Sequence, residues 1–483
     1  MPGNLPYAVL HRPRWPLLTC LALAACQPLA SRRGATVLFA SGADLQSINP
    51  LLTLHPLARQ VQRYVLLTTL ARYDSALVPR PYLARSWEWS ADRRRITFHL
   101  EPAVHWDDGP PTIAGDVAWT LGAARDPVTG YPRSTELAGL DSVAALDDST
   151  VLLRFATPQP RFPDVLTDLA ILPAHLLDTV PHDRLRQAAW NTAPVGNGPF
   201  RFVAHEPNRR WVFAANPRFP AALGGPPRLA RFILVVVDEP TTKLAALTAG
   251  ELDFAGIQPA HADFVRRDSA LAVLSYPVLL TYGLVLNTRR PPFDALAVRR
   301  RVDRAIDRRE IVDGYLYGFG TPAEGPVPPG VPGYLPVAPA AAAAPSGKGR
   351  ALRFELLTVG SGEAPLEQMV QSRLRSAGFD VTIRQLELSA FLGRVYGPSH
   401  DFEAAVLGVP GDLGLAYLQP LAELAGIAAP AEPGTAQRWF ADSVPVAFLY
   451  HARGLQGMNR RVHGVIMDMR GELATVHDWW VAP

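Results

Sequence analysis

The stretch from 83 to 121 constrains the fold more than any other part of the chain, because its pattern specifies three elements in succession. Apolar and polar residues alternate in two runs, the second of them at 96–100, with a short polar turn between them. Period-two alternation is typical of strands with one buried face, so the runs predict a β-hairpin. A turn rich in Asp, Gly and Pro at 107–111 then leads to a helix beginning near Thr112. Asp116 falls in the first turn of this helix, where the helix dipole favours a carboxylate.

The length of the chain predicts more than one hydrophobic core. It has 483 residues, whereas a single core usually serves about 250–300 residues. Hydrophobic residues make up 48% of the chain, yet no internal stretch approaches the roughly 18 apolar residues that a membrane-spanning helix needs. The formal net charge of +3 indicates neither a nucleic acid nor an anionic surface as partner. We therefore expect at least two lobes and no nucleic-acid binding.

Strands and helices alternate along the chain. The nearly continuous apolar run 231–237 predicts a buried strand, and a helix over 241–250 follows it. A β-α-β unit begins at Leu352, with a helix that Gly378 closes and a second strand at 379–383. Such alternation predicts an α/β fold.

Residues 294–306 predict an amphipathic helix capped by Asp294. One face of this helix is apolar, and its four arginines are expected on the solvated face: Arg299, Arg300, Arg301 and Arg304. A nucleic-acid-binding helix is the alternative, but Asp303 and Asp307 interrupt the positive charge. We therefore expect the arginines to be structural surface residues.

Three motifs, taken together and in this order, carry a family resemblance. They are Ser86-Trp87 with Val104, Trp106, Asp108-Gly109 and Asp116-Val117; then Pro194-Val195-Gly196-Asn197-Gly198-Pro199-Phe200; then NTRRPPFDALAVRRRVDRAIDR from Asn287. The glycines of the second motif favour either a positive φ or a close approach of two backbones. These motifs resemble those of the family 5 extracellular solute-binding proteins, the dipeptide, oligopeptide and nickel binding components of ABC importers.

The resemblance implies a two-lobe, type II periplasmic-binding-protein-like α/β fold with mixed sheets and a ligand cleft between the lobes. The first lobe would span 34–270, with 445–483 returning to it, and the second would span 271–444. A Pro/Ala-rich segment at 325–349 has the composition of an extended linker. Because two family segments have no counterpart in the second half, we expect the second lobe to be trimmed.

By the same resemblance, the protein would capture a peptide-like solute and deliver it to the permease and ATPase subunits of an ABC importer. We expect a monomer, without cofactor or bound metal and without enzymatic activity. A transport-inactive scaffold or solute sensor of the same fold is the alternative. An exported hydrolase is less favoured because the sequence lacks G-x-S-x-G and H-E-x-x-H motifs, although a Ser/His/Asp arrangement assembled in space stays open.

Asp412 is the candidate ligand-binding residue. The segment 408–414 resembles the family's G-W-x-G/A-D loop, with Val409 in place of the tryptophan. The resemblance implies that the aspartate pairs with the α-ammonium of a peptide; the alternative is a turn aspartate bonded to its own loop. The ligand itself stays open among peptide, nickel complex, sugar and haem. For nickel or haem, three solitary histidines could serve: His261, His400 and His451.

The N-terminal residues resemble a bacterial lipoprotein signal. Basic residues precede a short apolar run that ends in Leu23-Ala24-Ala25-Cys26. We expect 1–25 to be the signal peptide, Cys26 the lipidated residue and 26–33 a tether, so that the protein is extracytoplasmic or periplasmic and anchored to a membrane by lipid. A cleaved signal with an idle cysteine is the alternative. The sequence leaves inner and outer membrane open.

Overall fold

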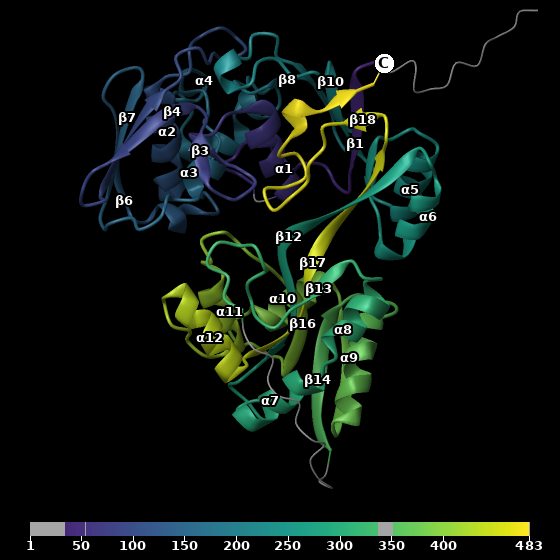
Figure 1. Ribbon diagram of the computed structural model, residues 1–483. Coiled ribbons are helices and arrows are strands. Elements are labelled where there is room, and N and C mark those ends of the chain that lie inside the picture. Colours follow the sequence, from purple (N-terminus) through teal and green to yellow (C-terminus); the bar gives the residue numbers. More distant parts are fainter. Residues whose placement is uncertain (1–33, 54, 337–350, 483) are drawn as a thin grey trace, which may run out of the picture.

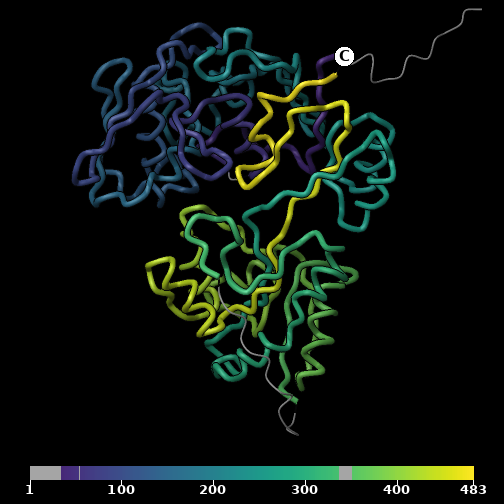
Figure 2. The backbone as a smooth tube through the Cα atoms, in the orientation of Figure 1, coloured from purple at the N-terminus to yellow at the C-terminus, as the bar shows by residue number. Residues whose placement is uncertain are grey.

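The computed structural model describes residues 34–53, 55–336 and 351–482. They form two lobes joined by two long strands, β12 (Leu271–Leu286) and β17 (Val446–Asn459) (Figure 1). The backbone passes from the upper lobe into the lower one along β12 and returns along β17 (Figure 2). The predicted signal peptide, the tether and Cys26 lie outside the described residues.

A mixed, 11-stranded sheet runs through both lobes. Its order is β15 (Phe379–Leu386), β14 (Leu352–Val359), β16 (Ala404–Pro410), β12, β17, β11 (Phe254–Gly256), β1 (Thr36–Ser41), β10 (Arg231–Val236), β9 (Arg210–Ala215) and β8 (Phe200–Glu206), with β13 (Gly320–Pro322) beside β17. β1 pairs with β10 in parallel, whereas β12 pairs with β17 in antiparallel. The predicted lobe boundaries fall beside the two crossing strands, and they stay a prediction.

The first lobe has a second sheet of four strands, in the order β4 (Ala84–Trp89), β5 (Arg95–Leu100), β7 (Thr150–Phe155) and β6 (Leu140–Ala145). The predicted hairpin is confirmed, since Trp87 lies opposite Phe98. The helix that follows, α2 (Ala114–Arg125), begins two residues later than expected. The reason is Asp116, whose buried carboxylate accepts a hydrogen bond from the Ile113 amide at 2.9 Å. This bond makes Ile113 the N-cap residue, so the first helical residue is Ala114.

The loop of the second motif, residues 194–200, packs against the π-helical turn Gln62–Leu66, and the two backbones approach each other closely. A Cβ atom on Gly196 would lie 2.3 Å from the Leu66 carbonyl oxygen, and one on Gly198 would lie 2.6 Å from the Leu66 carbonyl carbon. Asn197, between them, accepts the Thr68 amide at 2.8 Å. Of the two explanations for these glycines, close approach is therefore the correct one.

The second lobe packs helices on both sides of its strands. They are α7 (Leu296–Ala305), α8 (Arg308–Glu310), α9 (Pro365–Ser376), α10 (Leu388–Val395), α11 (Leu418–Ala425) and α12 (Pro433–Ser443). The predicted β-α-β unit is confirmed, because β14 and β15 pair in parallel with α9 between them in sequence. Arg299 contradicts the prediction of a solvated face: it is 6% exposed and donates to the carbonyl oxygens of Phe293, Asp294 and Ser443.

Residues 325–349 were predicted to form an extended linker, but the first part of this segment packs into the core of the second lobe. Val327 and Val331 are 1% and 3% exposed and belong to a core cluster of the second lobe. The Pro326 carbonyl oxygen accepts hydrogen bonds from the Thr281 and Tyr417 hydroxyl groups at 3.2 and 2.9 Å. The prediction gave weight to the many prolines and did not identify the two valines as core residues. Residues 337–349 lie outside the described residues.

The C-terminal segment packs against the first lobe. Trp479 is fully buried and stacks on Phe254 with ring centroids 4.7 Å apart. Arg461 forms an ion pair with the buried Asp253 at 2.7 Å. Both contacts hold the C-terminal segment at β11, and Figure 1 shows β18 of this segment next to β1.

The remaining elements are short. The strands are β2 (Ala71–Tyr73), β3 (Pro79–Pro81), β18 (Val462–His463) and β19 (Trp480–Val481), and the α-helices are α1 (Pro56–Val61), α3 (Val165–Asp168), α4 (Ala174–Leu177), α5 (Pro240–Thr248) and α6 (Ala262–Arg267). Turns of 3-10 helix lie at Pro127–Thr129, Ser134–Leu137, His182–Gln187, Ala189–Asn191, Ala221–Leu223, Pro259–His261 and Val476–Asp478, and a second π-helical turn lies at Ile311–Tyr315.

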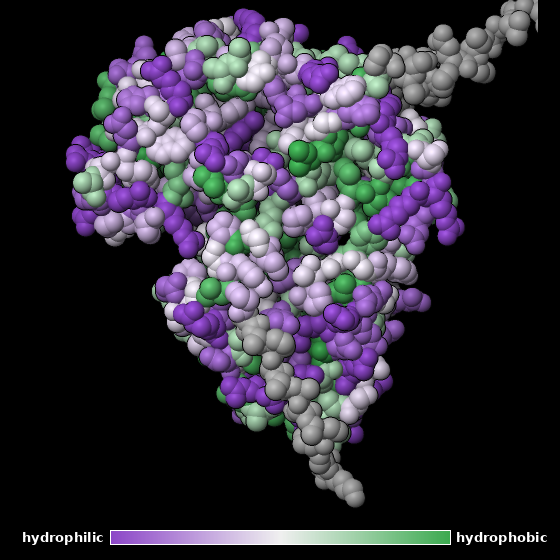
Figure 3. Space-filling view, viewed as in Figure 1, coloured by the Kyte–Doolittle hydropathy of each residue, from purple (hydrophilic) through white to green (hydrophobic). Residues whose placement is uncertain are grey.

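No helix among the described residues is long and apolar enough to cross a membrane. The visible face is mostly polar, with small separate apolar areas (Figure 3).

Candidate functional site

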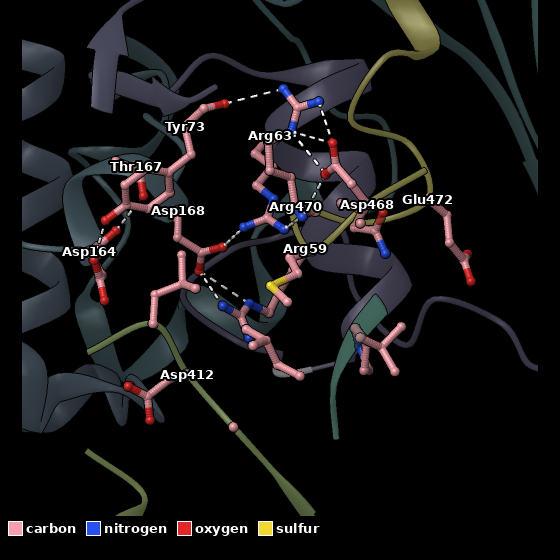
Figure 4. Close-up of a pocket in the computed structure, with 18 of the residues that line it drawn as sticks. Arg59, Arg63, Tyr73, Asp164, Thr167, Asp168, Asp412, Asp468, Arg470 and Glu472 are labelled. Carbon is pink, nitrogen blue, oxygen red and sulfur yellow. Dashed lines mark hydrogen bonds and ion pairs between the residues drawn. The ribbon is translucent and has the colours of Figure 1, made fainter. Parts of the chain in front are cut away.

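A pocket of about 380 Å³ lies between the two lobes (Figure 4). The first lobe contributes residues of α1, the adjoining π-helical turn and α3, while the second contributes the loop after β16. Its charged lining residues are Arg59, Arg63, Arg133, Glu136, Asp164, Asp168, Asp412, Asp468, Arg470 and Glu472. Carboxylates therefore outnumber guanidinium groups in the pocket, six to four.

Asp168, the last residue of α3, organises one wall of the pocket. Its carboxylate forms ion pairs with three guanidinium groups, those of Arg59, Arg63 and Arg133. Burial alone would raise the pKa of Asp168, but these arginines, Arg63 foremost, hold that pKa well below its ordinary value. Arg63 also donates to the Arg470 carbonyl oxygen at 2.8 Å. The ion pairs between Asp168 and the three arginines therefore hold this wall in place, and each of these charged groups already has a partner of opposite charge within the protein.

The fourth arginine of the pocket is paired as well. Arg470 binds both carboxylate oxygens of Asp468, at 2.6 Å for its Nη2 and at 2.9 and 3.1 Å for its Nε. Arg133 has a second carboxylate partner in Glu136, at 2.6 Å. All four guanidinium groups of this pocket are therefore matched by carboxylates of the protein, and none is left to neutralise the other acids.

Three carboxylates of the pocket have no arginine, lysine or histidine partner within the described residues: Asp164, Asp412 and Glu472. Glu472 instead accepts hydrogen bonds from the Tyr276 hydroxyl at 2.5 Å and the Gln456 side-chain amide at 3.2 Å. Asp164 precedes α3 in the first lobe and accepts a hydrogen bond from the Tyr73 hydroxyl. Asp412 follows β16 in the second lobe. A Cβ atom on Gly414 would lie 3.1 Å from Asp164 Oδ2 and 3.2 Å from Asp412 Oδ1. The two acids, one from each lobe, therefore face one small space.

Two carboxylates that face the same small space repel each other, so a cation between Asp164 and Asp412 would be favourable. Burial raises the pKa of Asp164; the Tyr73 hydrogen bond opposes the shift, and the nearby charge of Asp412 adds to it. A positively charged ligand group would relieve this repulsion. Figure 4 shows both acids on one side of the pocket, with Asp468 and Glu472 on the other.

The structure places Asp412 in the pocket and also bonds it to its own loop. Its two carboxylate oxygens accept the Ala416 and Tyr417 amides, at 3.0 and 3.1 Å. The hydrogen bonds within the loop therefore orient the Asp412 carboxylate, which still lines the pocket. Sequence reasoning missed Asp164, since no motif surrounds it and its place beside Asp412 depends on contact between residues 248 positions apart.

The three candidate histidines do not converge. His261 ends a 3-10 turn before α6, and His400 bonds the Val395 carbonyl oxygen at 3.0 Å in the second lobe. His451 is buried in an adjoining pocket, where burial lowers its pKa to about 4 and its Nδ1 lies 2.9 Å from Thr281 Oγ1. Within the described part of the chain, no group of three or more His, Cys, Asp or Glu side chains could hold a metal ion.

Solved structures share this fold over nearly the whole chain. The substrate-binding protein CtaP from Listeria monocytogenes superposes with a TM-score of 0.80 at 18% identity, covering 93% of this chain and 100% of that one. The oligopeptide-binding protein AppA from Bacillus subtilis gives 0.74 at 21%, covering 93% and 99%. These likenesses define the class, an α/β fold shared with ABC-transporter binding proteins. They give no support to the expected trimming of the second lobe, because the matches cover 93% of this chain and 99–100% of the solved chains. After Leu424, where the sequence looked short, the chain forms α12.

The family follows from the sequence match. Residues 78–421 match the bacterial extracellular solute-binding proteins, family 5, and the chain belongs to this family. Its members are binding proteins rather than enzymes. A putative ABC transporter peptide-binding protein of Brucella ovis is 31% identical over 242 residues, 50% of this chain and 45% of that protein. Di/tripeptide-binding protein 4 of Pseudomonas aeruginosa is 30% identical over 371 residues, 69% and 68% of the two chains. The match thus spans less than half the length of the Brucella protein.

Proposed function

We propose that this protein is the substrate-binding component of an ABC importer and that its ligand is a peptide with a free α-ammonium group. The observation that carries the proposal is the pair of carboxylates, Asp164 and Asp412, facing one space without a cationic partner in the described chain. A charge-assisted contact of this kind suits an ammonium group. The family and the names of the peptide-binding relatives support the same ligand class.

Closure of the lobes would be driven by the ligand. The first lobe, 34–270 with 445–483, presents Asp164, and the second lobe, 271–444, presents Asp412. An ammonium group between them interacts with both lobes, so it favours whichever arrangement brings them together. The crossing strands β12 and β17 would act as the hinge. A permease with its ATPase could then distinguish the loaded, closed protein from the empty one.

The first test is calorimetric titration with a dipeptide and tripeptide library and then with its best-binding member. Asp412→Asn should weaken binding at least about thirtyfold, because losing one partner of a desolvated charge pair costs about 2–5 kcal/mol. Asp164→Asn should weaken it in the same direction. As a control, Asp263→Asn alters a side chain that is 81% exposed in the first lobe and should leave affinity unchanged.

The same peptide, N-acetylated, separates this site from a general loss of binding. Acetylation removes the positive charge, so the wild-type protein should bind the acetylated peptide weakly and the Asp412→Asn protein should lose most of that discrimination. Equal wild-type affinity for the two peptides would refute the ammonium site.

We further propose that Cys26 carries the lipid that anchors the protein on the extracytoplasmic side of a membrane. The support is the sequence Leu23-Ala24-Ala25-Cys26 after a short apolar run. Cys26→Ser should abolish labelling with a radioactive fatty acid and leave the precursor uncleaved. Persistent labelling of the variant would place the acyl chain elsewhere.

A further inference from the structure

A contact between the two lobes lies on the other side of the crossing strands from the interlobe pocket. It joins Arg266 of α6 to Phe319, the residue that directly precedes β13. The guanidinium carbon of Arg266 lies 4.9 Å from the centroid of the Phe319 ring, within the range of a cation–π interaction. In Figure 1, α6 lies to the right of β12 and β17, whereas α3 and α11, near the pocket, lie to the left. Neither Arg266 nor Phe319 lines the pocket.

The two partners belong to different hydrophobic cores. Val265, next to Arg266 in the sequence, is fully buried in a cluster with residues of β1 and α5 in the first lobe. Leu316, three residues before Phe319, belongs to a cluster with residues of β14 and α9 in the second lobe. The contact of Arg266 with Phe319 therefore connects the lobes directly, in addition to the two strands that cross between them.

Each partner is attached to one of the crossing strands. α6 leads into the first-lobe end of β12 through a short turn, in which the Leu271 amide donates to the Asp268 carbonyl oxygen at 3.1 Å. Phe319 is followed by β13, whose first residue, Gly320, lies opposite Ala452 of β17. Bending of the strands between these two attachment points changes the distance between α6 and Phe319. The contact is therefore sensitive to the arrangement of the lobes.

The loop that presents Phe319 has a strained backbone. Two successive residues adopt positive φ angles, 52° at Tyr317 and 81° at Gly318. Glycine adopts this conformation readily, but it is unfavourable for tyrosine. Because Tyr317 is 60% exposed, burial of its own ring does not offset the strain. Such a conformation persists only where contacts of neighbouring residues hold it, and Phe319 supplies one of them through Arg266.

The lobes also meet on the pocket side in the same structure. A Cβ atom on Gly333 of the second lobe would lie 3.6 Å from Arg161 Nη2 of the first, and one on Gly414 would lie 3.1 Å from Asp164 Oδ2. The contact of Arg266 with Phe319 therefore exists in an arrangement in which the lobes are close together at the pocket. A contact that is made in one arrangement and lost in another stabilises the first.

We propose that the stacking of Arg266 on Phe319 is an interlobe latch, which favours the arrangement with the lobes in contact even when no ligand is bound. A cation–π interaction at an exposed site is strong enough to change the ratio of two arrangements about two- to fivefold. Arg266 also pairs with Asp263 at 3.1 Å, but both residues belong to α6, so this ion pair does not connect the lobes. The latch concerns the hinge and does not depend on what the cleft binds.

The experiment measures interlobe distances by double electron–electron resonance in the ligand-free protein. Nitroxide labels are attached at Leu146→Cys, 58% exposed after β6, and Arg438→Cys, exposed on α12. Both elements lie to the left of the crossing strands in Figure 1. The two native cysteines, Cys20 and Cys26, are replaced by serine so that only the introduced thiols react.

Two substitutions remove the latch. Phe319→Leu removes the aromatic face and keeps an apolar side chain, while Arg266→Gln removes the charge. Each should lower the ratio of short to long distances about two- to fivefold. The double variant should show no larger effect than either single variant, because both remove the same contact. Arg267→Gln, which alters the next exposed arginine of α6, is the control and should leave the distances unchanged.

An unchanged distance distribution in the Arg266→Gln protein would overturn the latch. An equal effect of Arg267→Gln would also overturn it, because the loss of positive charge alone would then explain the change. Additive effects of the two latch substitutions would mean that Arg266 and Phe319 act separately. Arg266→Gln alters an exposed side chain, so it decides the question even where Phe319→Leu does not fold. Because no ligand is present, failure of the proposed function would leave these results intact.

Discussion

Asp164 and Asp168 stand at the two ends of α3, yet their surroundings shift their pKa values in opposite directions. Burial acts on both, but three arginines reverse its effect at Asp168, whereas Asp164 has only the Tyr73 hydroxyl and lies near the charge of Asp412. Partners distant in sequence, rather than the helix, decide which acid is structural and which is open to a ligand. This is why the sequence singled out neither.

Asp107 supplies a pH-dependent test of stability. Burial raises the pKa of Asp107 to about 6, although a backbone hydrogen bond and two nearby arginines oppose the shift. In the unfolded chain the ordinary value is about 3.9. Between these values the folded protein keeps a proton that the unfolded chain has lost, so the contribution of Asp107 to stability falls as pH rises from about 4 to 6. At pH 7 the ionised, half-buried acid is a net cost.

Asp107→Asn removes this titration. Relative to the wild type, the variant should be more stable at pH 7 by up to about 2–3 kcal/mol, and the difference should shrink towards pH 4. Urea unfolding at the two pH values measures it. A stability difference that is the same at pH 4 and pH 7 would mean that the pKa of Asp107 is not raised.

Gly198 tests how the loop of the second motif fits the π-helical turn. A Cβ atom there would lie 2.6 Å from the Leu66 carbonyl carbon and 2.8 Å from the Leu67 nitrogen. Because both atoms belong to backbone, no change of rotamer relieves the overlap. Gly198→Ala should therefore lower the free energy of unfolding by about 1–3 kcal/mol or more.

Gly139→Ala is the matched control, since a Cβ atom at that position would meet no heavy atom within 4 Å. It should change stability little or raise it by up to about 1 kcal/mol, through the entropy of the unfolded chain. Urea unfolding measures both variants. Equal effects of the two substitutions would show that the Gly198 contact is not tight.

Elements with local signals were predictable from the sequence, and those decided by distant contacts were not. The hairpin around Trp87 and the β-α-β unit after Leu352 follow from periodicity and turn residues, and both are present. Arg299 was misplaced because its guanidinium group also donates to the Ser443 carbonyl oxygen, 144 positions away, a contact that the sequence does not indicate. Asp412 was found through its loop motif, but the position of Asp164 beside it depends on how the two lobes face each other.

At the scale of the molecule, two antiparallel strands connect the lobes and also line the cleft. Pro277 and Val278 of β12 line both the interlobe pocket and the adjoining pocket that contains His451, and Arg453 of β17 lines the adjoining pocket. A ligand held in the cleft is therefore in contact with the hinge itself. We expect binding and hinge motion to be coupled for this reason.

Small-angle X-ray scattering of the purified protein, with and without a saturating concentration of a peptide that calorimetry has shown to bind, tests the central claim most directly. If the protein captures its ligand by closing two lobes, the radius of gyration should decrease on binding, and the Asp412→Asn protein should show a smaller decrease at the same peptide concentration. An unchanged radius of gyration in a wild-type protein saturated with peptide would contradict capture by closure.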